Sequence, residues 1–302
     1  MPHNSDRPLI DYGVLLAVIT TLAWSGNAIA GKFAVGNVSP LMLTLCRWLF
    51  AATLVGLFGW RHLRNDWPEI RKNIGFLFAA GVFGFTVFNG LLYTSLKFTS
   101  AINVTILQST MPMMIFALNF LVYGMRVHWA QVVGYTVTLV GVLLIAGDGS
   151  MANLLELSFN IGDVLILLAV FVYAAYSVAL HAKPKLHWMS LLAMLSLFAL
   201  VASIPAAAAE YIAGETIMPT TFTAWAVVLY TAIFPSIISQ AAWIRCNELL
   251  GGNMASMFLN LVPIFGAALA VMILGEAFET YHALALTMVV GGIAIAQRLS
   301  RL

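Results

Sequence analysis

Two prolines stand in the middle of long apolar stretches, where a helix would lose a backbone hydrogen bond. Pro112 and Pro263 have no N–H group, and each ring clashes with the carbonyl four residues earlier. They should therefore leave the carbonyls of Gln108 and Leu259 without their usual donors. Such carbonyls are acceptors for a bound amine or for water, although a proline can also produce only a kink. Pro235 interrupts a third apolar stretch, and we interpret it as a hinge.

Aromatic and polar residues recur at helical spacing in these apolar stretches. Trp24 and Asn27 are three residues apart, and Ser239 and Trp243 are four apart. Residues at these spacings share one face of a helix. Each could instead contact lipid or bond to a neighbouring helix. The candidates for substrate binding are Trp24, Asn27, Tyr93, Gln108, Tyr173, Tyr176, Ser239, Gln240, Trp243 and Asn260.

The sequence offers no constellation for catalysis or metal binding. It contains no HExxH, GxSxG or P-loop motif, and its histidines lack ligand spacing. Cys46 and Cys246 lie in apolar stretches, and we interpret them as packing residues. Arg47 is the only ionisable residue well inside an apolar stretch, from which it could reach outward to an interface or bond inside a bundle. We therefore predict no catalytic residue, no metal and no cofactor.

The composition identifies the class of protein to which these residues belong. Of 302 residues, 62% are hydrophobic and 9% are charged, and the mean hydropathy is +0.95. Soluble proteins carry about 25% charged residues. The chain has too few charges to cover a surface in water, which excludes a soluble enzyme, a nucleic-acid-binding protein and a disordered regulator. It is predicted to be an integral membrane protein.

Ten apolar stretches are long enough to cross a bilayer, which requires about 17 to 25 residues per helix. They lack the two-residue alternation of a membrane barrel, so helices are the expected spanning elements. The predicted fold is an all-α bundle of ten transmembrane helices. Short breaks separate the stretches, and one of them is Asn65-Asp66-Trp67-Pro68. The stretches are 13–31, 41–60, 74–96, 100–123, 127–146, 161–181, 188–209, 224–246, 253–274 and 281–297.

Basic residues divide unequally between the two sets of loops that ten helices create. Lys32 and Lys97 are the two on the side away from the N-terminus. The positive-inside rule therefore predicts that both termini are cytoplasmic, in the inner membrane of a bacterial cell. The first stretch also resembles a secretory signal, but its removal would leave nine spans. The eleven basic residues on the N-terminal side are Arg7, Arg61, Arg64, Arg71, Lys72, Arg126, Lys183, Lys185, Arg245, Arg298 and Arg301.

The two halves of the chain align with each other at shifts of 149 to 151 residues. Gly13 then meets Gly162, Pro112 meets Pro263, and Gly141 meets Gly292. We interpret 1–147 and 148–302 as two repeats of five helices. Because five is odd, the second repeat must be inverted relative to the first. Inverted repeats with a shared site between them are typical of secondary transporters.

These features together resemble the EamA-type drug/metabolite transporter superfamily. The resemblance covers nearly the whole chain and implies the ten-helix fold and the export of amino acids, other metabolites or toxic cations. The chain is most similar in general appearance to the bacterial aromatic amino acid exporters. Family members often have a Gly-Glu pair after the fourth helix, where this chain has Gly124-Met125. The residues that carry the resemblance are Trp24-Ser25-Gly26-Asn27, Lys32, Arg47, Pro112, Pro263, Leu274-Gly275-Glu276 and Gly291-Gly292.

The leading hypothesis is a secondary transporter that exports amino acids or similar small amphipathic metabolites. The partners expected are a small-molecule substrate and the lipid bilayer, with no nucleic acid. Two alternatives are a transporter of phosphorylated sugars or nucleotides, for which Arg47 is a single cation, and a membrane enzyme that acts on lipids or isoprenoids. No Asp or Glu lies near the middle of a span, so we expect transport without obligatory proton exchange. The end residues His181, Glu276 and His282 are the alternative proton carriers.

Overall fold

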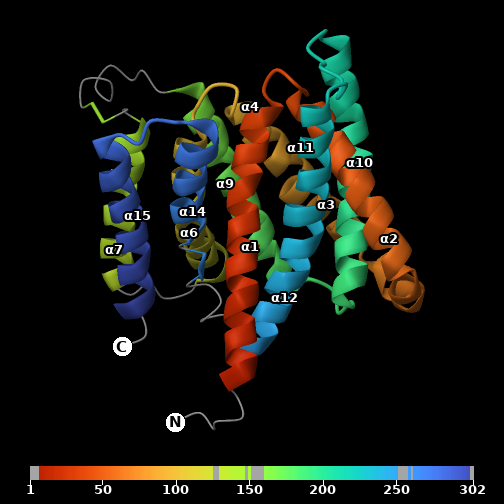
Figure 1. Cartoon of the computed structure of the whole chain (residues 1–302). Coiled ribbons are helices and arrows are strands. Elements are labelled where there is room, and N and C mark those ends of the chain that lie inside the picture. Colours follow the sequence, from red (N-terminus) through yellow and green to blue (C-terminus); the bar gives the residue numbers. More distant parts are fainter. Residues whose placement is uncertain are drawn as a thin grey trace.

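The described part of the chain is a bundle of helices. A computed structural model describes residues 7–124, 129–146, 149–150, 160–250, 258–259 and 261–299, and these contain no strand. The start of the first described helix and the end of the last one lie at the same end of the bundle (Figure 1). The first group of helices comprises α1 (Arg7–Ala34), α2 (Pro40–Lys72), α3 (Ile74–Gly81), η1 (Val82–Val87), α4 (Phe88–Ser95), α5 (Ala101–Gln108), α6 (Met111–Tyr123) and α7 (Trp129–Ala146).

The second group follows residue 160. Its helices are α9 (Ile161–Ala179), η2 (Leu180–Ala182), α10 (Trp188–Ile212), α11 (Phe222–Ile233), η3 (Phe234–Ile238), α12 (Ser239–Leu250), α14 (Leu261–Leu269), η4 (Ala270–Leu274) and α15 (Thr280–Leu299).

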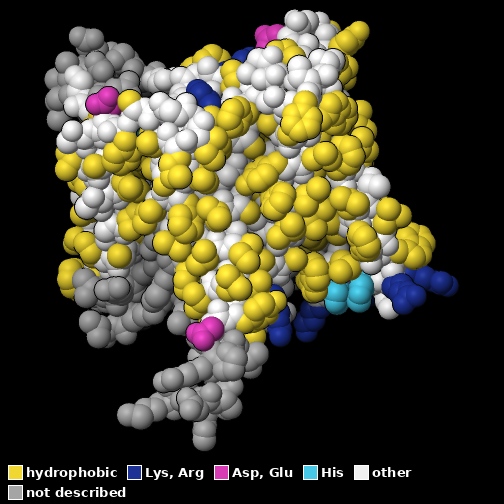
Figure 2. Space-filling model, viewed as in Figure 1, with side chains coloured by type: hydrophobic (Ala, Val, Ile, Leu, Met, Phe, Trp, Pro, Cys, Tyr) yellow, Lys and Arg dark blue, Asp and Glu magenta, His cyan; other side chains and the backbone are white. Residues whose placement is uncertain are grey.

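Ten apolar helical segments account for the predicted spans. Seven of them are long and apolar enough to cross a membrane, and three shorter ones cover 132–145, 261–274 and 280–295. On the face shown, hydrophobic side chains cover the middle of the bundle and charged side chains lie toward its two ends (Figure 2). The prediction of an all-α membrane protein is confirmed. Of the basic residues used to predict its orientation, Arg126 and Arg301 lie outside the described residues.

The predicted break at Asn65-Asp66-Trp67-Pro68 is wrong, because α2 continues through it to Lys72. Proline lacks the N–H that would bond to the carbonyl of Arg64. Arg64 and Pro68 are exposed, so water can satisfy this carbonyl where it could not in an apolar layer. The helix therefore tolerates Pro68 and extends beyond its apolar part.

Close packing joins helices from the two halves of the chain. α2 packs along α10, α7 along α15, α1 along α12, and α4 along α9. Glycine permits the closest approach, since a Cβ added to Gly292 on α15 would lie 2.4 Å from the carbonyl oxygen of Gly134 on α7. A Cβ added to Gly141 on α7 would in turn lie 3.0 Å from the carbonyl oxygen of Ala285 on α15. Each helix thus offers a glycine to the backbone of the other.

Candidate functional site

A buried arginine lies at the centre of a polar cluster that four helical segments build. Arg47 on α2 is 5% exposed. Its Nε donates to the hydroxyl of Ser236 at 2.8 Å, and its Nη1 donates to Oδ1 of Asn89 at 2.8 Å and Oδ1 of Asn27 at 3.1 Å. Nη1 also bonds to the hydroxyl of Tyr93. Of the two positions considered for Arg47, the structure therefore has the one inside the bundle.

The π-helical turn η3 positions Ser236. Pro235 cannot donate to the carbonyl of Thr231, four residues earlier. The hydroxyl of Ser236 donates to this carbonyl at 2.9 Å instead. The same hydroxyl oxygen accepts the bond from Arg47. A proline in the apolar core therefore produces both the distorted turn and the polar group that the turn directs at Arg47.

The other partners of Arg47 are held in place by bonds of their own. The Tyr93 hydroxyl donates to Oδ1 of Asn27 at 2.9 Å, and Nδ2 of Asn89 donates to the carbonyl of Phe85 at 2.6 Å. Asn89 and Tyr93 share one face of α4 because they are four residues apart. These bonds fix the carboxamide and hydroxyl oxygens toward the guanidinium group.

All of these partners of Arg47 are neutral. The Trp48 ring lies 5.0 Å from the guanidinium carbon, measured to the ring centroid, which adds a favourable contact with its π face. Amide, hydroxyl and ring dipoles thus replace water around the cation. Among the described residues, the ion pairs are Lys72–Glu69 and Lys97–Glu215, and neither includes Arg47.

Two pairs of aromatic side chains predicted to bind substrate are in contact with each other. The ring centroids of Trp24 on α1 and Trp243 on α12 are 5.5 Å apart, and those of Tyr173 and Tyr176 on α9 are 5.2 Å apart. Gln240 lies on α12, one residue after the buried Ser239. Aromatic surface and hydrogen-bonding groups therefore occur together, as a small amphipathic ligand requires.

Glycine makes room for one of these rings. A Cβ added to Gly84 in η1 would lie 2.5 Å from the Tyr176 ring. Any larger residue at position 84 would displace the ring from its contacts with Phe85 and Tyr173. The π-helical turn η1 thus positions Tyr176, much as the π-helical turn η3 positions Ser236.

The structure brings only some of the predicted binding residues to the arginine. Asn27 and Tyr93 contact it directly. Gln108 is the half-buried last residue of α5. Ser239 is buried, and within the described residues its hydroxyl has no hydrogen-bond partner. Asn260 lies outside the described residues.

Three residues of the cluster are absent from the binding residues predicted from the sequence, namely Arg47, Asn89 and Ser236. The signal for Arg47 is its charge within an apolar stretch, and the signal for Asn89 is its spacing of four residues from Tyr93 on one helix face. The signal for Ser236 was its position directly after Pro235, because a neighbouring hydroxyl can satisfy the carbonyl that a proline leaves free.

The helix-breaking prolines differ in their effects. Pro112 follows a turn at Ser109 and Thr110 and lies in the first turn of α6, so that span is two helices. The prediction that Pro263 leaves the carbonyl of Leu259 free is wrong, because this carbonyl accepts from the backbone N–H of Val262 at 3.1 Å. This tight turn satisfies the carbonyl locally.

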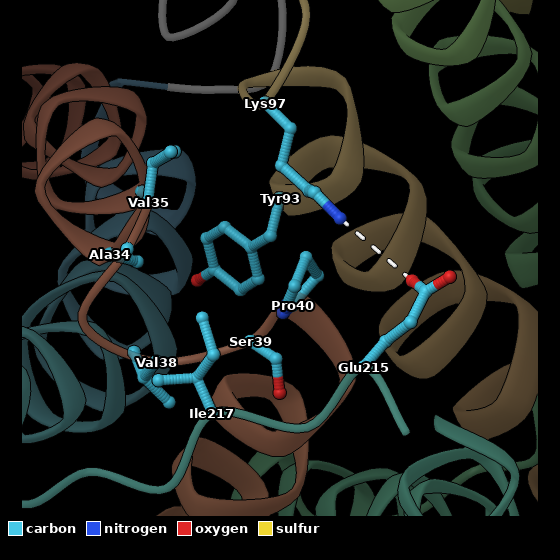
Figure 3. A pocket seen from close by; sticks show the side chains of 11 residues that line it. Ala34, Val35, Val38, Ser39, Pro40, Tyr93, Lys97, Glu215 and Ile217 are labelled. Atoms are coloured by element: carbon cyan, nitrogen blue, oxygen red, sulfur yellow. Dashed lines mark ion pairs between the residues drawn. The ribbon is translucent and has the colours of Figure 1, made fainter. Parts of the chain in front are cut away.

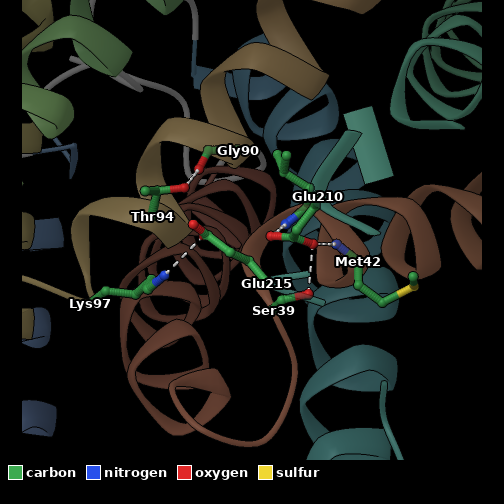
Figure 4. A network of polar contacts seen from close by, with 8 residues as sticks. Ser39, Met42, Gly90, Thr94, Lys97, Glu210 and Glu215 are labelled. Atoms are coloured by element: carbon green, nitrogen blue, oxygen red, sulfur yellow. Dashed lines mark hydrogen bonds and ion pairs between the residues drawn. The ribbon is translucent and has the colours of Figure 1, made fainter. Parts of the chain in front are cut away.

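A small pocket of about 50 Å³ opens at the end of the bundle away from the termini. The ring of Tyr93 points into it, between Val38 and the Lys97–Glu215 ion pair (Figure 3). The pocket wall is anchored by Glu210, which accepts bonds from the hydroxyl of Ser39 at 2.6 Å and from two backbone N–H groups at the start of α2 (Figure 4). A carboxylate at a helix N-terminus is favourable both as a cap and as a counter-charge to the helix dipole.

A larger pocket of about 420 Å³ lies at the same end, and Lys97 lines both. A chain of bonds leads inward from it, from His282 to Asn103 at 3.1 Å, from Asn103 to Thr99 at 3.2 Å, and from Thr99 to Asp163 at 2.7 Å. Glu276, considered above as a proton carrier, accepts from two backbone N–H groups at the start of α5. It therefore caps a helix.

The arrangement defines a multi-pass helical membrane protein with a buried polar cluster between its helices. The sequence model of the EamA-like transporter family matches residues 11–147 and again residues 160–297. The chain therefore belongs to the EamA-like transporter family, and it is a membrane transporter.

Similar proteins extend over almost the whole chain. The "Uncharacterized transporter YetK" of Bacillus subtilis is 24% identical over 94% of this chain and 86% of its own length. The "Probable amino-acid metabolite efflux pump" of Salmonella typhimurium is 23% identical over 93% of each chain. A solved crystal structure with 20% identity has a TM-score of 0.64 and covers 96% of this chain and 97% of its own, which shows a shared fold.

Proposed function

We propose that this transporter exports amino acids or similar small amphipathic metabolites by alternating access. The observation that carries the proposal is the cluster around Arg47, to which the first half of the chain contributes Asn27, Asn89 and Tyr93 and the second half contributes Ser236. A site made by both halves can be exposed to either side when the halves rock against each other. The name of the Salmonella relative supports the substrate class.

We further propose that residues 1–147 and 148–302 are inverted repeats. At the shift that aligns the halves, α1 corresponds to α9 and α4 corresponds to α12. The contact of α1 with α12 is therefore matched by the contact of α9 with α4, as two equivalent halves require. The π-helical turns η1 and η3 begin 152 residues apart, close to the shift that aligns the halves. The family model also matches each half separately.

The proposed substrate has an apolar body and hydrogen-bonding ends. Trp24, Trp243, Tyr173 and Tyr176 would contact the body, and the aromatic faces would also attract an ammonium group. Gln240 and the carbonyl of Gln108, to which Pro112 cannot donate, would accept its N–H groups. We propose the inner membrane as its location, with both termini in the cytoplasm.

The test is transport by the purified full chain in proteoliposomes. Vesicles that contain the protein are offered labelled amino acids, sugars and organic cations, with and without a pH gradient. We expect saturable movement of one or more amino acids, with protein-free vesicles as the control. A homogeneous, folded preparation that moves sugars or cations but no amino acid would contradict the proposed substrate class.

A further inference from the structure

We propose that the guanidinium group of Arg47 binds the carboxylate of the transported molecule. The transporter would then select compounds that carry a carboxylate and reject the corresponding amines. This inference rests on the proposed function, because it assigns one part of the substrate to one residue of the same site.

The charge of Arg47 is the first observation behind this assignment. The side chain is 5% exposed, and its hydrogen-bond partners within the described residues are two carboxamides and two hydroxyl groups. A cation removed from water is costly unless an anion or several dipoles compensate it. Among the described residues, dipoles alone surround the guanidinium group of Arg47, so the site retains a full positive charge. A monoanionic ligand would neutralise it.

The geometry of the hydrogen bonds is the second observation. Within the described part of the chain, the bonds of the guanidinium group come from Nε and Nη1. Nη1 has two hydrogens but lies within bonding distance of three oxygen atoms. It can therefore release one of these oxygen atoms and still use both hydrogens. A carboxylate can accept from Nη1 and Nη2 together, in the two-pronged geometry that guanidinium groups favour.

The third observation is the position of the cation beside the aromatic residues. The Trp48 ring lies 5.0 Å from the guanidinium carbon of Arg47 and stacks on Phe85, whose ring contacts Tyr176 beside Tyr173. Tyr173 continues to Tyr176 and Phe88 through ring contacts. A molecule whose carboxylate meets Arg47 can therefore lay an apolar body along these rings. One cation suits one carboxylate, whereas a dianionic phosphate would leave an uncompensated charge.

The competing explanation is that Arg47 only holds the helices together. An internal carboxylate separates the two explanations. Oδ1 of Asn27 accepts bonds from Arg47 and Tyr93. An aspartate has the same shape as asparagine and keeps this acceptor oxygen for both bonds. Asn27→Asp would give Arg47 a permanent counter-ion. If Arg47 is purely structural, Asn27→Asp should leave the stability of the protein unchanged or raise it. If Arg47 binds substrate, the same substitution should weaken the binding of carboxylates.

The experiment compares matched carboxylates and amines on the detergent-solubilised full chain. The pairs are tryptophan with tryptamine, phenylalanine with phenethylamine, and leucine with isopentylamine. The wild type should bind at least one amino acid about tenfold or more tightly than its amine, since a hydrogen bond to a charged group contributes on that scale. Arg47→Gln and Asn27→Asp should reduce this ratio to near one. Arg61→Gln, which removes an exposed charge from the same helix, should leave it unchanged.

Each outcome separates this inference from the proposed function. If amino acids are transported but the amines bind equally well, or if Arg47→Gln and Asn27→Asp keep the preference, the role of Arg47 is wrong and amino acid export stands. If carboxylates bind through Arg47 but the vesicles move no amino acid, the anion site stands and the export proposal is wrong. A wild type that binds none of the carboxylates overturns the inference. Melting curves with and without ligand identify any variant that fails to fold.

Discussion

The hydroxyl group of Ser236 connects Arg47 to the backbone of a different span. It accepts from Nε of Arg47 at 2.8 Å and donates to the carbonyl of Thr231 at 2.9 Å. The bond that steadies the π-helical turn and the bond that orients the cation thus share one oxygen atom. The turn and the cation cannot move independently while both bonds persist.

We expect Ser236→Ala to destabilise the folded protein by about 1 to 3 kcal/mol, because it leaves a buried charged N–H without its acceptor. Thermal unfolding in detergent measures the effect as a lower melting temperature. Ser196→Ala is the matched control, since Ser196 is also buried but its hydroxyl has no partner among the described residues. Equal melting temperatures for the two variants would show that the bond to Arg47 contributes little.

The close contact between α7 and α15 gives a second prediction. A Cβ at Gly292 would lie 2.4 Å from a backbone oxygen that cannot move away, so Gly292→Ala should cost about 1 to 3 kcal/mol through overpacking. Gly291→Ala should be nearly neutral, because nothing lies within 4 Å of its added Cβ. The two melting temperatures form the comparison, and the prediction fails if the Gly291 variant is the less stable.

The predicted cavity can be tested by labelling. Gln108→Cys and Trp243→Cys, each in a background with Cys46 and Cys246 replaced, should react with a small polar thiol reagent, and substrate should protect them. Both residues are half-buried, so a reagent can reach them only from a water-filled space or from lipid. Asn260→Cys completes the predicted set. Reaction with lipid-soluble reagents alone would assign these side chains to the lipid-facing surface.

The orientation of the chain gives a fourth prediction. A reporter enzyme that is active only in the periplasm should be silent when fused after Leu302, because the basic residues at that end of the bundle favour the cytoplasm. The same reporter inserted at Gly214, in the turn after α10, should be active. The opposite pattern would reverse the orientation.

The fifth prediction concerns energetics. Since the charged group in the described cluster is a guanidinium, which stays protonated, transport should run down the substrate gradient without obligatory proton exchange. Loaded proteoliposomes at clamped membrane potential should show no uphill efflux when an inward proton gradient is imposed. Uphill efflux that an ionophore abolishes would contradict this. Asp163 and His282, at the two ends of the bonded chain, would then be the residues to replace.

The sequence was sufficient for the fold because the spans depend on composition and length, which are local properties. It could not predict the continuation of α2 through Pro68, since that depends on whether water reaches the carbonyl of Arg64. The cluster around Arg47 depends on side chains as far apart in the sequence as Arg47 and Ser236. Helical spacing places residues on a face, but it does not say which faces meet.

Tyr93 contributes both to the small pocket and to the cluster around Arg47. Its ring lines the small pocket at the end away from the termini, and its hydroxyl bonds to Arg47 (Figure 3). A ligand that replaces this hydroxyl on the guanidinium group would free a side chain that forms part of the pocket wall. Ligand binding at Arg47 and movement of the Tyr93 side chain are then thermodynamically linked, and each favours the other by the same free energy. The affinity of a ligand would therefore include the work of moving one tyrosine, and a ligand that leaves the tyrosine in place would bind without changing the pocket.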